Sequence, residues 1–214
     1  ARKIFVAATG QHCGKTTTSI CLLHMARKKY KSVGYIKPVG PKPTTLHGHT
    51  VDKDAVLIAQ VFGLHKHLRY MTPAPIFHDT TCRVIDNEIA VSELEDKVCQ
   101  AVSELEKRCD FIVIEGAGHP GVGAVMKLSN ARIASMLGAP VLLVTGGGVG
   151  SVIDTVCMDL ALFEKEGSEV RALLANKLNP EKRDHTLDYL RRGLGGESFA
   201  VIGGFDYQPV LADP

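Results

Sequence analysis

Residues 3–20 read KIFVAATGQHCGKTTTSI, which is an apolar run, a glycine-bearing loop and then apolar residues at helical spacing. The apolar run at 4–8 is typical of a buried parallel strand. The loop at 9–16 reads TGQHCGKT, and Thr9 stands where the pattern G-x-x-x-x-G-K-[S/T] has its first glycine. A Gly-Lys-Thr triplet also arises by chance in glycine-rich turns. The strand before it and the helix after it favour a phosphate-binding loop.

The chemistry of such a loop comes from its backbone and two side chains. Backbone N–H groups of the loop and of the helix start converge on an anion, and the helix dipole adds to their attraction. Lys15 would reach the β- and γ-phosphates as a catalytic cation, and the Thr16 hydroxyl would bind Mg²⁺. We therefore predict a nucleotide site with contacts from Thr9, Gly10, Gln11, His12, Cys13, Gly14, Lys15, Thr16 and Thr17.

Length, net charge and cysteine content limit the domain organisation and the partners that the chain is expected to have. At 214 residues the chain predicts a single domain spanning 1–214. A net charge of +2 gives no reason to expect nucleic acid or an anionic membrane as partner. No apolar run approaches the roughly 18 residues of a membrane span. The six cysteines contain no C-x-x-C pair, which favours reduced thiols in a cytoplasmic protein over a zinc site.

Short apolar strands alternate with amphipathic helices along the rest of the chain. We predict further strands at 32–36, 111–115, 140–144, 170–175 and 199–202, and helices at 52–62, 92–105, 129–137, 151–166 and 179–193. The alternation predicts an α/β fold, a doubly wound, mostly parallel sheet with helices on both faces. Residues 41–50 and 68–86 carry few periodic cues, so we expect them to be irregular apart from a short strand in the second segment.

Side chains at the expected helix starts are typical caps. Asp52 would cap the helix that follows it, and Ser92 would open a capping box with Glu95. Ser151 and Asp154 would occupy the N-cap and third positions of the helix at 151–166.

Charged side chains are predicted at the carboxyl edge of the sheet, where such folds bind ligands. Lys37 follows the strand at 32–36, and the alternative for it is a solvated surface lysine. Glu115 ends the strand at 111–115 in a Walker B pattern, which would face the metal held by Thr16. Asp54 lies in a first helical turn, where the helix dipole alone explains a carboxylate.

With these residues the chain resembles dethiobiotin synthetase and the wider P-loop group that includes cobyrinic acid a,c-diamide synthases. It also resembles the dethiobiotin-synthetase-like domain at the N-terminus of some phosphotransacetylases. The likeness rests on the loop at 9–16, Lys37-Pro38-Val39, Asp54, residues 115–118 (EGAG) and Asn176. It implies that Lys37 faces the substrate as a second catalytic lysine, that Thr16, Asp54 and Glu115 bind Mg²⁺, and that Asn176 contacts adenine.

The resemblance implies an enzyme that uses ATP and Mg²⁺ to phosphorylate a carboxylate or carbamate for attack by an amine. The acceptor would be a small amino-carboxylate or a related molecule, and the protein a homodimer. Two alternatives stay open. In the first alternative, the chain is a nucleotide-binding regulatory ATPase module. In the second, it is a cobyrinate-type amide synthase domain that lacks its glutaminase.

Three departures from the dethiobiotin pattern bear on the acceptor. Residues 40–42 (GPK) replace the family's serine, and the glycine-rich loop after Glu115 contains His119 and Pro120. Asp154 stands where that enzyme has a helix start receptive to the substrate's carboxylate. If Asp154 points into the site, its charge should repel such an acceptor, unless it caps its own helix.

Overall fold

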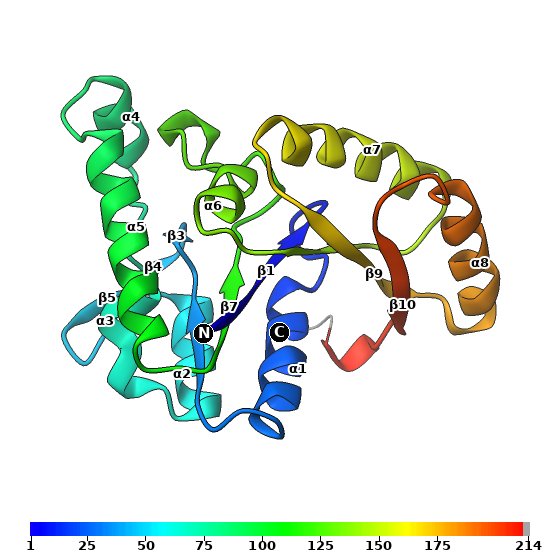
Figure 1. Cartoon of the computed structure of the whole chain (residues 1–214), viewed down its shortest axis with the longest axis horizontal. Helices are drawn as coiled ribbons and strands as arrows, with labels where there is room; N and C mark the ends of the chain where they lie inside the picture. Colours follow the sequence, from blue (N-terminus) through cyan, green and yellow to red (C-terminus); the bar gives the residue numbers. More distant parts are fainter. Residues whose placement is uncertain (212–214) are drawn as a thin grey trace.

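The computed structural model describes residues 1–211, and a six-stranded parallel sheet forms its centre (Figure 1). The strands in spatial order are β10 (Ala200–Asp206), β9 (Val170–Leu178), β8 (Val141–Thr145), β1 (Arg2–Ala8), β7 (Phe111–Glu115) and β2 (Val33–Ile36). Because β1 pairs with both β7 and β8, the loop that follows β1 leaves the middle of the sheet.

Alternating side chains of β1 divide the core into two halves. Phe5 and Ala7 point to one face of the sheet, and Val6 and Ala8 point to the other; all four are fully buried. A strand buried on both faces reads as a continuous apolar run rather than as an alternating pattern. This explains why residues 4–8 mark a central strand.

Helices cover both faces, which confirms the predicted fold class. The face of Val6 packs against α1 (Lys15–Arg27) and α2 (Lys53–Phe62). The face of Phe5 packs against α5 (Val91–Glu106), α6 (Asn130–Met136), α7 (Gly150–Lys165) and α8 (Arg183–Gly193). Within residues 1–211, none of the helices has the length and apolarity that a bilayer-spanning segment needs.

The segments expected to be irregular contain further regular structure, so that part of the prediction is wrong, although the short strand expected within 68–86 is present. Residues 41–50 contribute to an antiparallel hairpin of β4 (Pro43–Leu46) and β5 (His49–Asp52). His47 and Gly48 turn the chain with φ values of 47° and 76°, the sign that type I′ hairpin turns require. Residues 68–86 contain α3 (Leu68–Met71), β6 (Ala74–Pro75) and α4 (Thr80–Ile85), and β6 pairs with β3 (Val39–Gly40).

The predicted caps have different outcomes. The Asp52 side chain accepts a hydrogen bond from the backbone N–H of Asp54, which confirms it as the N-cap of α2. The capping box at Ser92 is wrong, because α5 begins at Val91 with Ala90 at its N-cap position. The cap at Ser151 is also wrong, because α7 already begins at Gly150.

Candidate functional site

The loop between β1 and α1 is tied to the neighbouring strands. The backbone N–H of Thr9 donates to the carbonyl of Val144 in β8 at 3.0 Å. The side-chain hydroxyl of Thr9 donates to the hydroxyl of Thr145 at 3.3 Å. The loop then enters α1 through Gly14, whose φ is +97°. A residue with a side chain rarely adopts this left-handed conformation, so the backbone requires glycine here.

Asn176 braces this loop from β9, which extends beyond its predicted end to Leu178. Its Nδ2 atom donates to the carbonyl of Cys13 at 2.8 Å. A Cβ atom at Gly14 would lie only 2.0 Å from that same Nδ2 atom. The close approach is a second reason for glycine at this position, and it places Asn176 directly beside the phosphate-binding loop.

Lys15 lies between this loop and the glycine-rich loop after β7. It is 9% exposed, and its Nζ atom donates to the carbonyls of Gly10 at 3.1 Å and Gly118 at 2.9 Å. Burial lowers the pKa of Lys15, and the attraction of Glu115 opposes part of that effect. The second loop is itself held by Asn130, whose side chain bonds to Ala117 and to the carbonyl of His119.

Glu115, at the carboxyl end of β7, is fully buried and accepts three hydroxyl hydrogen bonds. Its Oε1 atom accepts from Thr16 at 2.8 Å, and its Oε2 atom accepts from Ser19 at 2.7 Å and from Tyr35 at 2.9 Å. Burial raises the pKa of Glu115; Lys37 and the Ser19 and Thr16 hydroxyls offset part of the rise. Burial and the charge of Glu115 also raise the pKa of Tyr35 well above its usual range, so Tyr35 stays a donor.

Lys37 lies among three carboxylates beside Glu115. Its Nζ atom forms an ion pair with Asp54, lies 3.2 Å from Asp52 Oδ1 and is 4.0 Å from Glu115 Oε1. Burial lowers the pKa of Lys37, but the three carboxylates outweigh this and raise it overall. The lysine is therefore a buried cation, and the alternative of a solvated surface lysine is wrong.

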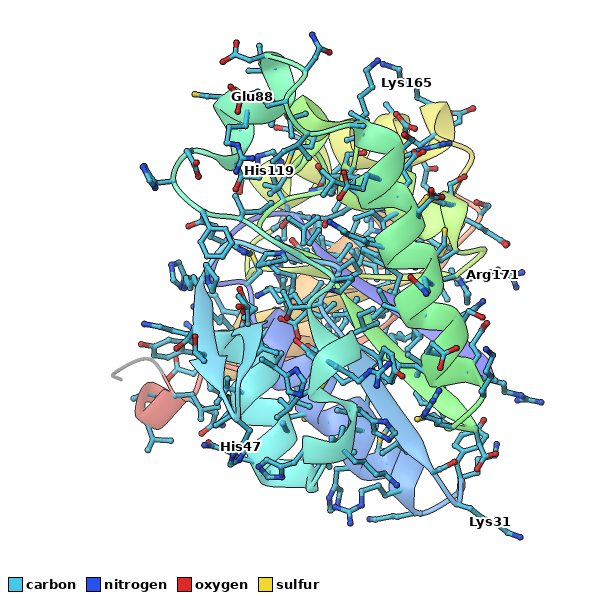
Figure 2. All side chains as sticks on the ribbon, turned by 90° about the vertical axis from the view of Figure 1, so that its left-hand side faces the viewer. Lys31, His47, Glu88, His119, Lys165 and Arg171 are labelled. Carbon is cyan, nitrogen blue, oxygen red and sulfur yellow. The ribbon has the colours of Figure 1, made fainter. Side chains whose placement is uncertain are left out.

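The structure brings five predicted residues together at the carboxyl edge: Lys15, Thr16, Lys37, Asp54 and Glu115. Gln11, His12 and Thr17 lie on the exposed side of the loop, and Asp154 is an exposed residue of α7. His47 lies in the turn of the hairpin, well apart from His119 (Figure 2).

Four buried polar residues of this site were not predicted: Ser19, Tyr35, Asp52 in its contact with Lys37, and Asn130. Ser19 lies one helical turn after Thr16, so helical spacing could have placed it beside the same carboxylate. Tyr35 lies two residues before Lys37 in a strand that otherwise reads as core. A tyrosine in a buried strand requires a partner for its hydroxyl, and that requirement was the available signal.

A glycine-bearing loop that leads from a central parallel strand into a helix, with a carboxylate from the adjacent strand bound to its threonine, is the arrangement of P-loop nucleotide-binding proteins. The chain belongs to the AAA domain family of these proteins, whose pattern matches residues 2–214.

Curated relatives indicate which members of this family the chain is similar to. The chain is 26% identical over 208 residues to the ATP-dependent dethiobiotin synthetase of Aromatoleum aromaticum, covering 94% of this chain and 90% of that one. It is 24% identical over 183 residues to a phosphate acetyltransferase of Synechocystis, covering 83% of this chain and 25% of that one. Cobyric acid synthases are also among its relatives. These are the branches that the residue pattern indicates.

Solved structures share the fold at low sequence identity. The MinC:MinD cell division protein complex of Aquifex aeolicus gives a TM-score of 0.60 with 16% identity, covering 100% of this chain and 84% of that one. At this identity the likeness concerns the fold alone.

Proposed function

We propose that the protein is an ATP- and Mg²⁺-dependent enzyme that phosphorylates a carboxylate or carbamate, so that an amine attacks the resulting mixed anhydride. The observation that carries the proposal is the contact between Thr16 of the loop and buried Glu115, with Lys37 and Asp54 beside them. Relatives of this length are named ATP-dependent dethiobiotin synthetases, which supports a ligase over a sensor module.

The residues present fit a metal that is bound together with a nucleotide. Within residues 1–211 no group of three or more His, Cys, Asp or Glu is arranged to hold a metal by itself. Mg²⁺ is commonly held by one or two carboxylates plus substrate phosphates and water. Thr16, Asp54 and Glu115 would hold it here, with Glu115 acting through the Thr16 hydroxyl. The ion would neutralise charge that develops on the phosphates.

The two lysines have separate tasks in this proposal. Lys15 reaches across the phosphate-binding loop, so it would stabilise the β- and γ-phosphates. Lys37 is held as a buried cation by carboxylates, so it would face the phosphoryl group and the acceptor from the other side. Fixed positive charges that are aimed at a loose phosphoryl transition state supply most of the catalysis in this reaction class.

The base is proposed to be adenine. An asparagine pairs well with adenine N6 and N7, and Asn176 lies beside the loop with an amide that still has hydrogen-bonding capacity. The segment 176–179 (NKLN) resembles the guanine reader N-K-x-D, but Asn179 stands in place of the aspartate that guanine requires. We expect ATP to outcompete GTP by about 1–3 kcal/mol, or about 5- to 150-fold.

ATP hydrolysis measured with and without candidate acceptors tests the proposal. An enzyme hydrolyses ATP faster when its acceptor is present, whereas a regulatory module binds ATP and barely turns it over. Lys15→Ala is the control, because losing a phosphate-binding cation should abolish binding and hydrolysis while the fold remains. Wild-type ATP affinity in this variant would contradict the site itself.

Diaminopelargonate with bicarbonate, ATP and Mg²⁺ is the first acceptor to test, with dethiobiotin as the product measured. Asp154 is an exposed residue of α7 beyond its first turn. If it faces the acceptor, we expect weak or no dethiobiotin formation, since repulsion between unit charges about 4 Å apart reaches about 4 kcal/mol at an effective dielectric near 20. Robust turnover would identify an ordinary dethiobiotin synthetase. Other amino-carboxylates then complete the acceptor screen.

A further inference from the structure

Tyr35 contacts the candidate site from the interior of the protein. It belongs to β2, is fully buried, and pairs in register with Val113, two residues before Glu115 on β7. Its hydroxyl donates to Glu115 Oε2 at 2.9 Å. The tyrosine therefore contacts the carboxylate and stays shielded from solvent.

The two oxygens of Glu115 have different partners. Oε2 accepts from both Ser19 and Tyr35, and these two contacts fix the plane of the carboxylate. Oε1 is then left to accept from Thr16 at 2.8 Å. A threonine hydroxyl has one proton and two lone pairs. With its proton committed to Glu115, the lone pairs of Thr16 turn away from the carboxylate, which is the orientation that a cation requires.

We propose that Tyr35 is a positioning residue for the cation-binding hydroxyl of Thr16, and that it acts through Glu115. This inference rests on the proposed function, because it concerns the Mg²⁺ that accompanies ATP. A tyrosine that only satisfied a buried carboxylate would contribute to stability and would leave the metal dependence of nucleotide binding unchanged. The two roles therefore differ in what they predict for binding.

The test measures the dissociation constant of ATP twice for each variant, by calorimetry in EDTA and in excess Mg²⁺. Tyr35→Phe removes only the hydroxyl. We expect its ATP affinity in EDTA to stay within about twofold of wild type and its gain in affinity on adding Mg²⁺ to fall about tenfold, as loss of one hydrogen bond to a charged group predicts. Ser19→Ala removes the other donor to Oε2, and we expect the same signature from it.

Tyr70→Phe is the matched control. Tyr70 is also buried, and its hydroxyl donates to a glutamate, Glu104, at 3.4 Å, away from the loop. We expect Tyr70→Phe to leave both affinities unchanged, even if thermal unfolding shows a comparable loss of stability in the two tyrosine variants.

Three results would overturn the inference. Equal losses of affinity in EDTA and in Mg²⁺ would show that Tyr35 shapes the loop rather than the metal contact. Unchanged affinities in Tyr35→Phe and Ser19→Ala would show a purely structural role, while the proposed function would stand. A wild-type protein that binds ATP equally with and without Mg²⁺ would refute the metal part of the proposed function, and the inference would fall with it.

Discussion

Two buried carboxylates, Glu115 at the end of β7 and Asp159 in the middle of α7, have opposite surroundings. Glu115 accepts hydrogen bonds from three hydroxyl groups and has Lys37 nearby. Asp159 is 9% exposed, and within the described chain its Oδ2 atom is buried without a hydrogen-bond partner. Burial raises the pKa of both groups, and that of Asp159 rises to about 7.

The difference between the two carboxylates lies in how their buried negative charge is compensated. A buried charge is costly unless donors and opposite charges compensate it. At Glu115 four side chains supply that compensation: Thr16 and Ser19 of α1, Tyr35 of β2, and Lys37 just beyond β2. At Asp159 the cost is uncompensated, so protonation is the available relief. The proposed metal-linked role therefore concerns Glu115, whereas for Asp159 we expect a pH-dependent loss of stability.

The largest effect is expected from Glu115→Gln. The amide would present a donor to hydroxyl groups that now donate, and the negative charge beside Lys37 would be lost. We expect acceptor-stimulated ATP turnover to fall about 10²–10³-fold, the range for losing one preorganised electrostatic contact. Steady-state kinetics in saturating Mg²⁺ measure it. Asp159→Asn, assayed in parallel at pH 6, should retain wild-type turnover, and equal losses in both variants would erase the distinction.

The second prediction concerns stability as a function of pH. The pKa of Asp159 is higher in the folded protein, about 7, than its ordinary value of 3.8. The folded state therefore binds the proton more tightly than the unfolded state. This contribution to stability is fully present below about pH 4 and is lost as the pH rises to about 7.

Asp159→Asn removes that loss. We expect the variant to gain about 2 kcal/mol of unfolding free energy over wild type at pH 8, less than the full linkage because the amide also lacks a partner. The gain should shrink toward zero at pH 4. Urea denaturation at both pH values measures it, with Glu164→Gln, exposed on the same helix, as the control. A gain independent of pH would show that Asp159 does not titrate between these values.

The features of the fold and the candidate site that depend on local sequence pattern could be predicted from the sequence. The strand at 111–115, the strand–loop–helix order around residues 9–16 and the cap at Asp52 are confirmed because period, glycine placement and cap chemistry are local signals. Contacts between distant segments leave weaker signals, which indicate that a polar side chain needs a partner but do not name the partner. Tyr35 and Ser19 meet Glu115 only after three elements have packed. Asp159 falls at helical spacing on the buried stripe of Val152, Val156 and Phe163, so its burial could have been predicted, whereas its lack of a partner could not.

The remaining errors have local causes. The hairpin at 43–52 was missed because its turn is His47-Gly48, a less common choice than Asn-Gly or Asp-Gly. Ser92 has the composition of a capping box, but α5 gains a further residue before it, and its side chain then lies within the first turn. Boundaries of helices are the least certain part of any interpretation from pattern.

The smallest effect is expected from Asp54→Asn, because the carboxylate of Asp54 is neither fully buried, as Glu115 is, nor without a partner, as Asp159 is. Its side chain is 29% exposed and forms an ion pair with Lys37, so solvent already compensates part of its charge. The backbone N–H of Asp54, which the Asp52 cap engages, is retained in the variant. Helix α2 should therefore keep its start, and stability should change by no more than about 0.5 kcal/mol.

The metal dependence of Asp54→Asn should nevertheless shift. With one carboxylate fewer at the site, we expect the Mg²⁺ concentration for half-maximal ATP turnover to rise about fivefold, a surface-like electrostatic contribution of about 1 kcal/mol. ATP affinity in EDTA should stay near wild type. A Mg²⁺ titration identical to wild type, accompanied by a loss of stability, would show that Asp54 only serves the first turn of α2, where a carboxylate is favoured in any case. The site would then rely on Thr16 and Glu115 alone for the cation.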